Sequence, residues 1–253
     1  MEMGNHRQGR TAMNDSIDVT FDHRTDAGGR DLDLFSPRLK RHHQLLWNKP
    51  LPSGEMFSLI PMRNRYLVFR EDDLAYSLSS DQISNSMRTT QRMTHITSHI
   101  APEELDEFQY LGATLGGTIL FPGKQINRKI TINVARGWNR EIEDRFDLTL
   151  ECIRLQYQGV PNPLEQTLKV YWKFFELFED FVRYTEFFLL QDLVENGNVK
   201  HYLPFEGFGR SGLPANLDEY RRYMNNAMAF VRERQLRIRD WAESQLPPEG
   251  KRP

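Results

Sequence analysis

Three carboxylates with helical spacing mark the part of the chain where chemistry is easiest to place. Asp144, Asp147 and Glu151 stand at i, i+3 and i+7, so a helix would carry all three on one face. Carboxylates grouped in this way can act as a general base or hold a divalent metal. Arg136 and Arg140 precede them, and planar guanidinium groups suit phosphate or carboxylate ligands. The spacing therefore indicates a site for an anionic substrate.

A helix over residues 139–157 is the element that would position these groups. Apolar residues recur through this range at the spacing of one helix face. The start of a helix presents free backbone N–H groups and positive partial charge, so anions bind there readily. Arg136 and Arg140 would reinforce this start, which predicts a phosphate site beside the carboxylates.

Two further segments are candidates for the same cleft. Gly117 and Thr118 belong to a flexible connection, and Ser80 and Asp81 follow a predicted strand. The second pair could supply a hydroxyl and a carboxylate, or it could cap the next helix. We predict three catalytic and six substrate-binding residues: Asp147, Glu151 and Asp144, and Arg136, Arg140, Gly117, Thr118, Ser80 and Asp81.

The charged helix face also has a purely structural interpretation. Arg145 and Arg154 lie beside the carboxylates in the sequence, and such residues form ion pairs at i, i+3 and i, i+4 on solvated helix surfaces. Surfaces of this kind are far commoner than active sites. The sequence thus leaves a catalytic and a non-catalytic interpretation open.

Other motifs that carry chemistry are incomplete. His95 and His99 are four residues apart, but Ile96 stands where the zinc-protease pattern has Glu, and no third ligand follows. Cys152 is the only cysteine, so no intramolecular disulfide can form, and its apolar surroundings indicate a buried thiol. There is no Walker loop and no Gly-x-Ser-x-Gly elbow. We assign no residue to a metal, and the sequence names no cofactor.

Two patterns near the N-terminus are weaker still. Asp31 and Asp33 resemble the carboxylate pair of nucleotidyltransferases, but no strand separates them from the preceding glycines, and turn or capping roles explain them. Arg38 and His43 have the Arg-x-x-x-x-His spacing of some helical ribonucleases. The predicted strands argue against that all-helical fold.

The order of predicted elements indicates an α+β fold around a single core, with a β-rich N-terminal half packed on a helical C-terminal half. Strands are predicted at residues 17–21, 56–60, 66–69, 75–79, 118–121, 130–134 and 199–205. Helices are predicted at residues 37–47, 93–100, 139–157 and 164–194, and from residues 102 and 216 onward. One domain is expected over residues 17–246, between disordered tails at 1–16 and 247–253.

Composition limits the classes of partner. The 253 residues carry 33 Lys+Arg against 35 Asp+Glu, a formal charge of −2, which makes no case for non-specific binding to nucleic acid or membranes. No segment approaches the roughly 20 apolar residues of a membrane helix, and residues 1–16 lack the apolar core of a signal peptide. With a single cysteine as well, these features predict a cytoplasmic protein with no membrane partner.

Five segments carry a resemblance to a known family: LLWNKPLPSG at 45–54, LSSD at 78–81, GTILFP at 117–122, DRFDLTLECI at 144–153 and FFLLQDLV at 187–194. They resemble a family of uncharacterised bacterial proteins of about this size, over residues 17–238. The resemblance implies a bacterial source and a single-domain unit. It implies no reaction and no catalytic residue.

From the residues we predict an enzyme that acts on a phosphate-containing substrate, a nucleotide or nucleic acid. A role in defence would suit a bacterial protein of this kind, but no residue argues for it. Arg136 and Arg140 would hold phosphate, and Asp147 and Glu151 would act on the bound substrate. The alternative is a non-catalytic interaction protein that self-associates as a homo-oligomer. Its binding surface would be the aromatic-rich helices that carry Phe174, Phe181 and Phe188.

Overall fold

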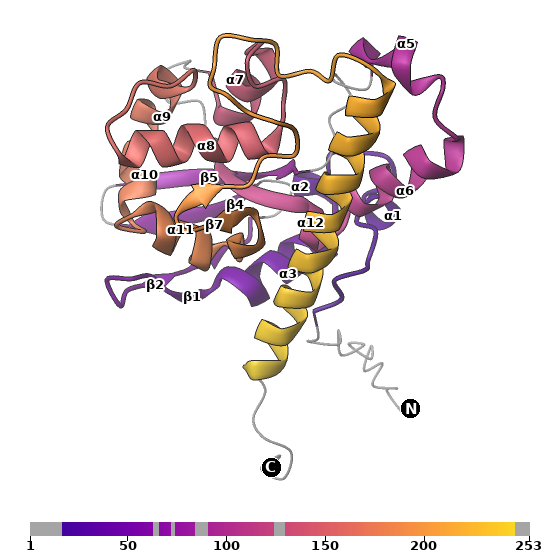
Figure 1. The fold of residues 1–253 in the computed structure, drawn as a ribbon. Helices are drawn as coiled ribbons and strands as arrows, with labels where there is room; N and C mark the ends of the chain where they lie inside the picture. Colours follow the sequence, from indigo (N-terminus) through magenta and orange to yellow (C-terminus); the bar gives the residue numbers. More distant parts are fainter. Residues whose placement is uncertain (1–16, 63–65, 72–73, 84–90, 124–129, 246–253) are drawn as a thin grey trace, which may run out of the picture.

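A four-stranded antiparallel sheet lies at the centre of the computed structural model, which describes residues 17–62, 66–71, 74–83, 91–123 and 130–245 (Figure 1). The strand order is β3 (Leu59–Ile60), β4 (Leu67–Glu71), β5 (Leu74–Gln82) and β6 (Thr118–Pro122). Strand β6 is buried along its whole length. The predicted meander and the strand at 118–121 are thus confirmed, and the predicted tails lie outside the described residues.

Near its C-terminal end, β5 has no described strand paired to one of its two edges. Strand β4 pairs with β5 only as far as Leu78, whereas β6 pairs with β5 from Leu78 to Gln82. The last four residues of β5 therefore have a strand neighbour on one side only. Both residues predicted to act at this point, Ser80 and Asp81, lie in that singly paired stretch.

The N-terminal helices pack beside this strand end. They are α1 (Arg24–Ala27), α2 (Leu32–Phe35) and α3 (Pro37–Trp47). The start of α3 is as predicted, because the Ser36 side chain accepts a hydrogen bond from the Leu39 N–H and proline follows at the first helical position. The strand predicted at 17–21 is not formed. A short hairpin of β1 (Lys49–Pro50) and β2 (Met56–Phe57) follows α3.

The middle of the chain departs most from the prediction. Helices α5 (Thr94–Thr97) and α6 (Pro102–Gly112) lead through the 3-10 turn η1 (Leu115–Gly117) to β6. The predicted strand at 130–134 is instead the start of helix α7 (Ile132–Trp138), whose N-cap is the Thr131 side chain.

The helix predicted from residue 139 begins later, as α8 (Phe146–Tyr157). Glu143 and Asp144 have φ values of 49° and 66°. This left-handed backbone cannot continue a right-handed helix, so a turn separates α7 from α8.

The long helix predicted over 164–194 is broken into α9 (Glu165–Val170), α10 (Trp172–Glu176), α11 (Phe181–Phe187) and the 3-10 turn η2 (Gln191–Leu193). Left-handed residues at Glu179 and Leu189 interrupt it, and the Asp180 side chain caps α11. In one continuous helix, the aromatic residues of this segment would point to all sides, and many would be left without a packing partner. Three short helices can fold around a shared aromatic cluster, with Phe178 ring centroids 5.2 Å from Phe188 and 5.4 Å from Tyr184.

The C-terminal part consists of a two-residue hairpin, β7 (Val194–Glu195) and β8 (Asn198–Val199), a long loop, and helix α12 (Leu217–Ser244). Of the strand predicted at 199–205, only Val199 lies in a strand, β8. Helix α12 has 28 residues and is capped by Asn216 as predicted. At 1.5 Å per residue it is about 42 Å long and crosses the whole molecule (Figure 1).

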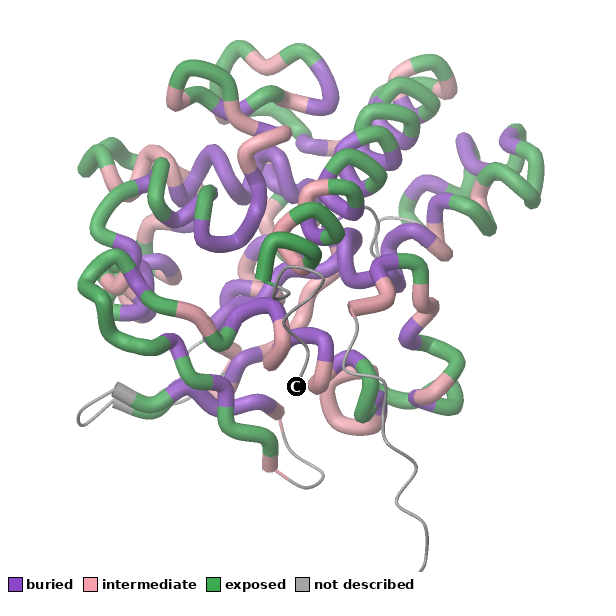
Figure 2. The backbone as a smooth tube through the Cα atoms, turned by 90° about the horizontal axis from the view of Figure 1, so that it is seen from below, coloured by how far each residue is buried: buried purple, intermediate pink, exposed green. Residues whose placement is uncertain are grey.

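The buried hydrophobic side chains form one cluster that joins the sheet to the helices on both sides. Figure 2 shows buried residues throughout the interior and exposed residues along the outer side of α12. The central sheet is antiparallel and its strands all lie in the N-terminal half of the chain, so the fold is α+β as predicted. Among the described segments, no helix has the length and apolar character needed to cross a membrane.

Candidate functional site

The singly paired end of β5 gathers four of the nine residues that the sequence selected. Side chains alternate between the two faces of a strand, and here Ser80 faces α3 while Asp81 faces α7, as their hydrogen bonds show. Arg136 of α7 and Asp144 of the following turn complete the group. We call Ser80, Asp81, Arg136 and Asp144 the β5 cluster.

Arg136 is the centre of the β5 cluster and has no exposed surface. Its guanidinium pairs with the carboxylates of Asp81 and Asp144, the latter at 3.0 Å, and its Nε donates to Thr149 Oγ1 at 2.9 Å. It also donates to the backbone carbonyl of Asp144. Because the guanidinium is enclosed and already paired, a substrate phosphate cannot reach it without displacing a carboxylate. The helix start expected at Arg136 is absent too, since this residue lies inside α7.

The turn between α7 and α8 brings Asp144 onto Arg136. The Asp144 N–H donates to the Arg136 carbonyl at 3.1 Å, while the Asp144 side chain and carbonyl both contact the guanidinium. Two consecutive left-handed residues, Glu143 and Asp144, make this possible. Such backbone costs energy in non-glycine residues and is concentrated at functional sites. Arg92, 42% exposed at its side chain, pairs with Glu143 and adds a second cation beside the cluster.

The free edge of β5 is capped by a carboxylate that the sequence did not select. Both oxygens of Asp33, in helix α2, accept the Ser80 N–H at 2.9 Å. Asp33 thereby takes the place of the missing strand neighbour. No local pattern could have revealed this, because the contact spans 47 residues.

Two carboxyl groups at this point are held less acidic than usual. Burial raises the pKa of Asp33 to about 7, although hydrogen bonds from Ser80 act in the opposite sense. Burial also raises the pKa of Asp81 to about 6; the charge of Arg136 lowers it and that of Asp144 raises it. Both residues nevertheless remain partly exposed. Raised carboxyl pKa values in a partly accessible position are a mark of acid–base sites.

His43 contacts the cluster from α3. Its Nε2 lies 2.9 Å from Ser80 Oγ, and its Nδ1 accepts the Trp47 indole N–H at 3.1 Å. An indole nitrogen can only donate, so the proton of the neutral ring sits on Nε2. His43 therefore donates to Ser80 and does not activate its hydroxyl. Burial holds the pKa of His43 well below its ordinary value.

The other five selected residues lie elsewhere. Asp147 is fully buried, pairs with Arg145 at 2.5 Å and accepts the Tyr202 N–H at 2.9 Å. Glu151 is held by both ends of the Arg154 guanidinium, at 2.8 and 2.7 Å. The carboxylate face predicted on the helix is thus not a single surface.

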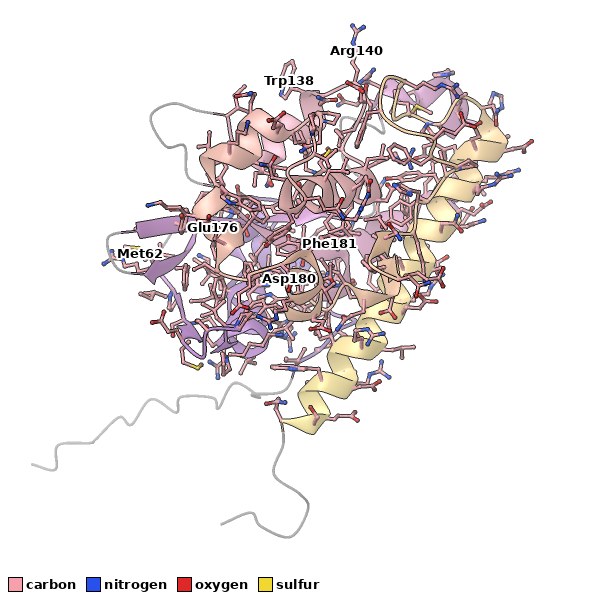
Figure 3. All side chains as sticks on the ribbon, turned by 60° about the vertical axis from the view of Figure 1, so that its left-hand side comes forward. Met62, Trp138, Arg140, Glu176, Asp180 and Phe181 are labelled. Carbon is pink, nitrogen blue, oxygen red and sulfur yellow. The ribbon has the colours of Figure 1, made fainter. Side chains whose placement is uncertain are left out.

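The last three of these five residues are also apart from the β5 cluster. Arg140 projects outward beside Trp138 (Figure 3). Gly117 and Thr118 are buried at η1 and the start of β6, where Thr118 Oγ1 donates to the Leu115 carbonyl at 3.1 Å.

A pocket of about 250 Å³ lies near α8 but is separate from the β5 cluster. Glu141, Arg145 and the glycine-rich loop at 207–212 line it. Within the described ranges, no group of three or more His, Cys, Asp or Glu side chains is arranged to hold a metal ion.

Comparison with known proteins gives a family and no activity. A family model described as a family of unknown function (DUF6994) matches residues 17–238. Searches of curated proteins and of solved structures find no match. Because the matched range covers most of the 253 residues, the chain belongs to the family of unknown function DUF6994.

Proposed function

We propose that this protein is an enzyme in which Asp81 and Asp33 act as a general base and a general acid. The observation that carries the proposal is that two partly exposed carboxyl groups meet at one end of β5. Asp81 belongs to the strand, and Asp33 accepts the N–H of the neighbouring Ser80. Burial raises the pKa of Asp81 to about 6 and that of Asp33 to about 7. Of the two, Asp33 has the higher pKa and would hold the proton, while the Arg136 charge favours the ionised form of Asp81. Carboxyl pairs separated in this way divide the acid and base roles.

The substrate class that we propose is a phosphate ester, such as a nucleotide. Asp81 would take a proton from the attacking water, and Asp33 would return one to the leaving oxygen. The phosphate would be held by Arg92, which keeps 42% of its side chain exposed while it pairs with Glu143. This assigns to Arg92 the part that the sequence suggested for Arg136, whose guanidinium is enclosed.

The self-association alternative has less support from the described residues. Phe174, Phe181 and Phe188, which would have formed its surface, are at most 6% exposed. They are used in the core instead. A structural role for Asp147 and Glu151 fits their arginine partners and is compatible with the enzyme proposal.

The test is hydrolysis of a panel of phosphate monoesters, diesters and nucleotides, measured as release of phosphate from the monoesters and of the alcohol product from the diesters. We expect activity with a bell-shaped pH dependence whose limbs fall near pH 6 and 7. Asp81→Asn should lower kcat by about 10²- to 10⁴-fold, the usual contribution of a positioned acid or base. Arg92→Ala should mainly raise KM.

Glu165→Gln is the matched control, because Glu165 forms an exposed ion pair with Lys169 on α9. This variant should keep wild-type kinetics. The proposal fails if the wild type neither turns over nor is thermally stabilised by any member of the panel. It also fails if folded Asp81→Asn retains kcat within a few-fold.

A further inference from the structure

A second chemically unusual group, Lys49, lies in the β1–β2 hairpin, away from the β5 cluster. Its Nζ donates to the Phe187 carbonyl at 2.6 Å. Three aromatic rings surround the amine, with centroids 4.6 Å away for Phe187 and 5.0 Å away for both Trp47 and Trp241. Elements from three parts of the chain therefore build one aromatic cage around a lysine.

The cage contains no counter-charge. Among the residues that the structure describes, no carboxylate forms an ion pair with Lys49 Nζ, whereas Lys169 and Arg237 both have carboxylate partners. The guanidinium carbon of the fully buried Arg234 lies 6.0 Å from the centroid of the same Trp47 ring. Burial lowers the pKa of Lys49 to about 7, and the charge of Arg234 acts in the same direction.

The aromatic rings oppose this effect in part. A cation over an aromatic ring is attracted by the ring's negative face, which favours the ammonium form. The removal of the amine from water favours the neutral form, as for other buried lysines that serve as nucleophiles. For Lys49 the loss of water outweighs the rings, so a substantial fraction of the amine is unprotonated at neutral pH.

Lys49 is also a lining residue of a surface pocket. Lys49, Leu51, Arg183 and Glu186 line a pocket of about 400 Å³ on the surface of the molecule. The proline-flanked hairpin and Phe187 supply apolar walls, and Arg183 and Glu186 supply the polar ones. A small molecule in this pocket would lie against Lys49.

We propose that Lys49 is a nucleophilic amine that captures aldehyde-bearing small molecules in this pocket as imines. The nitrogen lone pair of the neutral amine forms a bond to the carbonyl carbon, and the carbonyl oxygen takes up a proton as the nitrogen loses one. The resulting carbinolamine then expels its hydroxyl as water, which leaves a C=N bond to Nζ. No oxidant or reductant takes part, and the aldehyde is the only co-reactant.

The experiment uses the full chain and pyridoxal as the aldehyde probe, with borohydride added to trap any imine. Peptide mass spectrometry then compares Lys49 with the exposed Lys173 and Lys200. We expect Lys49 to be labelled at least tenfold faster than either, with a half-maximal rate near pH 7. Lys49→Arg should abolish that label without changing those at the other two sites.

A second variant separates chemistry from folding. Trp241→Leu opens one wall of the cage at the last turns of α12, so labelling of Lys49 should slow at pH 7 while the protein stays folded. Labelling of Lys49 no faster than Lys173 would overturn the proposal. So would stabilisation by inorganic phosphate alone, lost in Lys49→Met, with no trapped imine, because the pocket would then be an anion site with a charged lysine.

Discussion

The imidazole of His43 and the hydroxyl of Ser80 lie 2.9 Å apart, yet the hydrogen bond between them runs from the ring to the serine. Trp47 determines this direction, because its N–H occupies the other ring nitrogen at 3.1 Å. A serine beside a histidine is therefore not evidence for a nucleophile here. The pair instead fixes Ser80 so that its backbone N–H meets Asp33.

This arrangement predicts the state of the ring directly. In ¹H–¹⁵N spectra, His43 should show the neutral Nε2–H tautomer from pH 5 to 8, because burial holds its pKa well below the ordinary value. Exposed His95 supplies an internal reference. Titration of His43 between pH 6 and 7, or a protonated Nδ1, would contradict the geometry.

Replacing Asp33 with asparagine should change how stability depends on pH. The pKa of Asp33 is raised from 3.8 to about 7 in the folded protein, so between these pH values the folded state binds the extra proton. The wild type must then lose stability as pH rises through this window.

Asp33→Asn keeps an acceptor oxygen for Ser80 and removes the charge. Relative to the wild type it should gain about 3–4 kcal/mol in free energy of unfolding between pH 4 and pH 8, as measured by urea denaturation at each pH. A difference that is constant with pH would show that Asp33 ionises normally.

Two arginines one turn apart on α12 should differ sharply in their contribution to stability. Arg234 is fully buried and donates to four backbone carbonyls, those of Phe188, Leu189, Gly116 and Thr118. Arg234→Met leaves these acceptors without donors and should cost about 3 kcal/mol or more.

The matched control is Arg237→Met, which removes a partly exposed ion pair with Asp192. Its expected cost is about 0–1 kcal/mol. Denaturant unfolding of both variants measures the difference. Equal losses would mean that the carbonyl contacts of Arg234 contribute little.

A pair of glycines tests whether Gly117 belongs to a binding site or to the core. A Cβ at Gly117 would lie 2.1 Å from the Leu111 carbonyl oxygen and 2.8 Å from Gly112 Cα, so Gly117→Ala requires movement of backbone and should cost about 3 kcal/mol or more.

At Gly137 the nearest atom would be 3.5 Å away, which is ordinary contact. Gly137→Ala in α7 should stay within about 1 kcal/mol of the wild type, since alanine also favours the helix. Thermal melting of both variants compares them. A mild Gly117→Ala would reopen a ligand-binding role for this connection.

Local signals predicted the elements whose ends carry their own caps. Ser36 with Pro37 placed α3, and Asn216 placed the start of α12, because a side chain that caps a helix is visible in the sequence itself. The cap at Thr131 is the same type of signal. It was missed because β-branched residues after it favour a strand on propensity alone.

The site was only partly accessible to such reasoning. Arg136 and Asp144 are eight residues apart, and their contact depends on a left-handed turn between α7 and α8. No sequence motif predicts this turn. Asp33 and His43 reach β5 across 47 and 37 residues. Asp147 and Glu151, in contrast, pair with arginines two and three positions away. That result agrees with the structural interpretation of these charges.

Helix α12 has a consequence for how the chain is made. Its Arg234 supplies the hydrogen bonds for backbone carbonyls at η1, β6 and the end of α11, all synthesised earlier. Those segments can collapse on the ribosome, but these carbonyls lack the Arg234 donor until α12 has left the exit tunnel. A nascent chain stalled before residue 234 should therefore stay more sensitive to protease than one that includes α12.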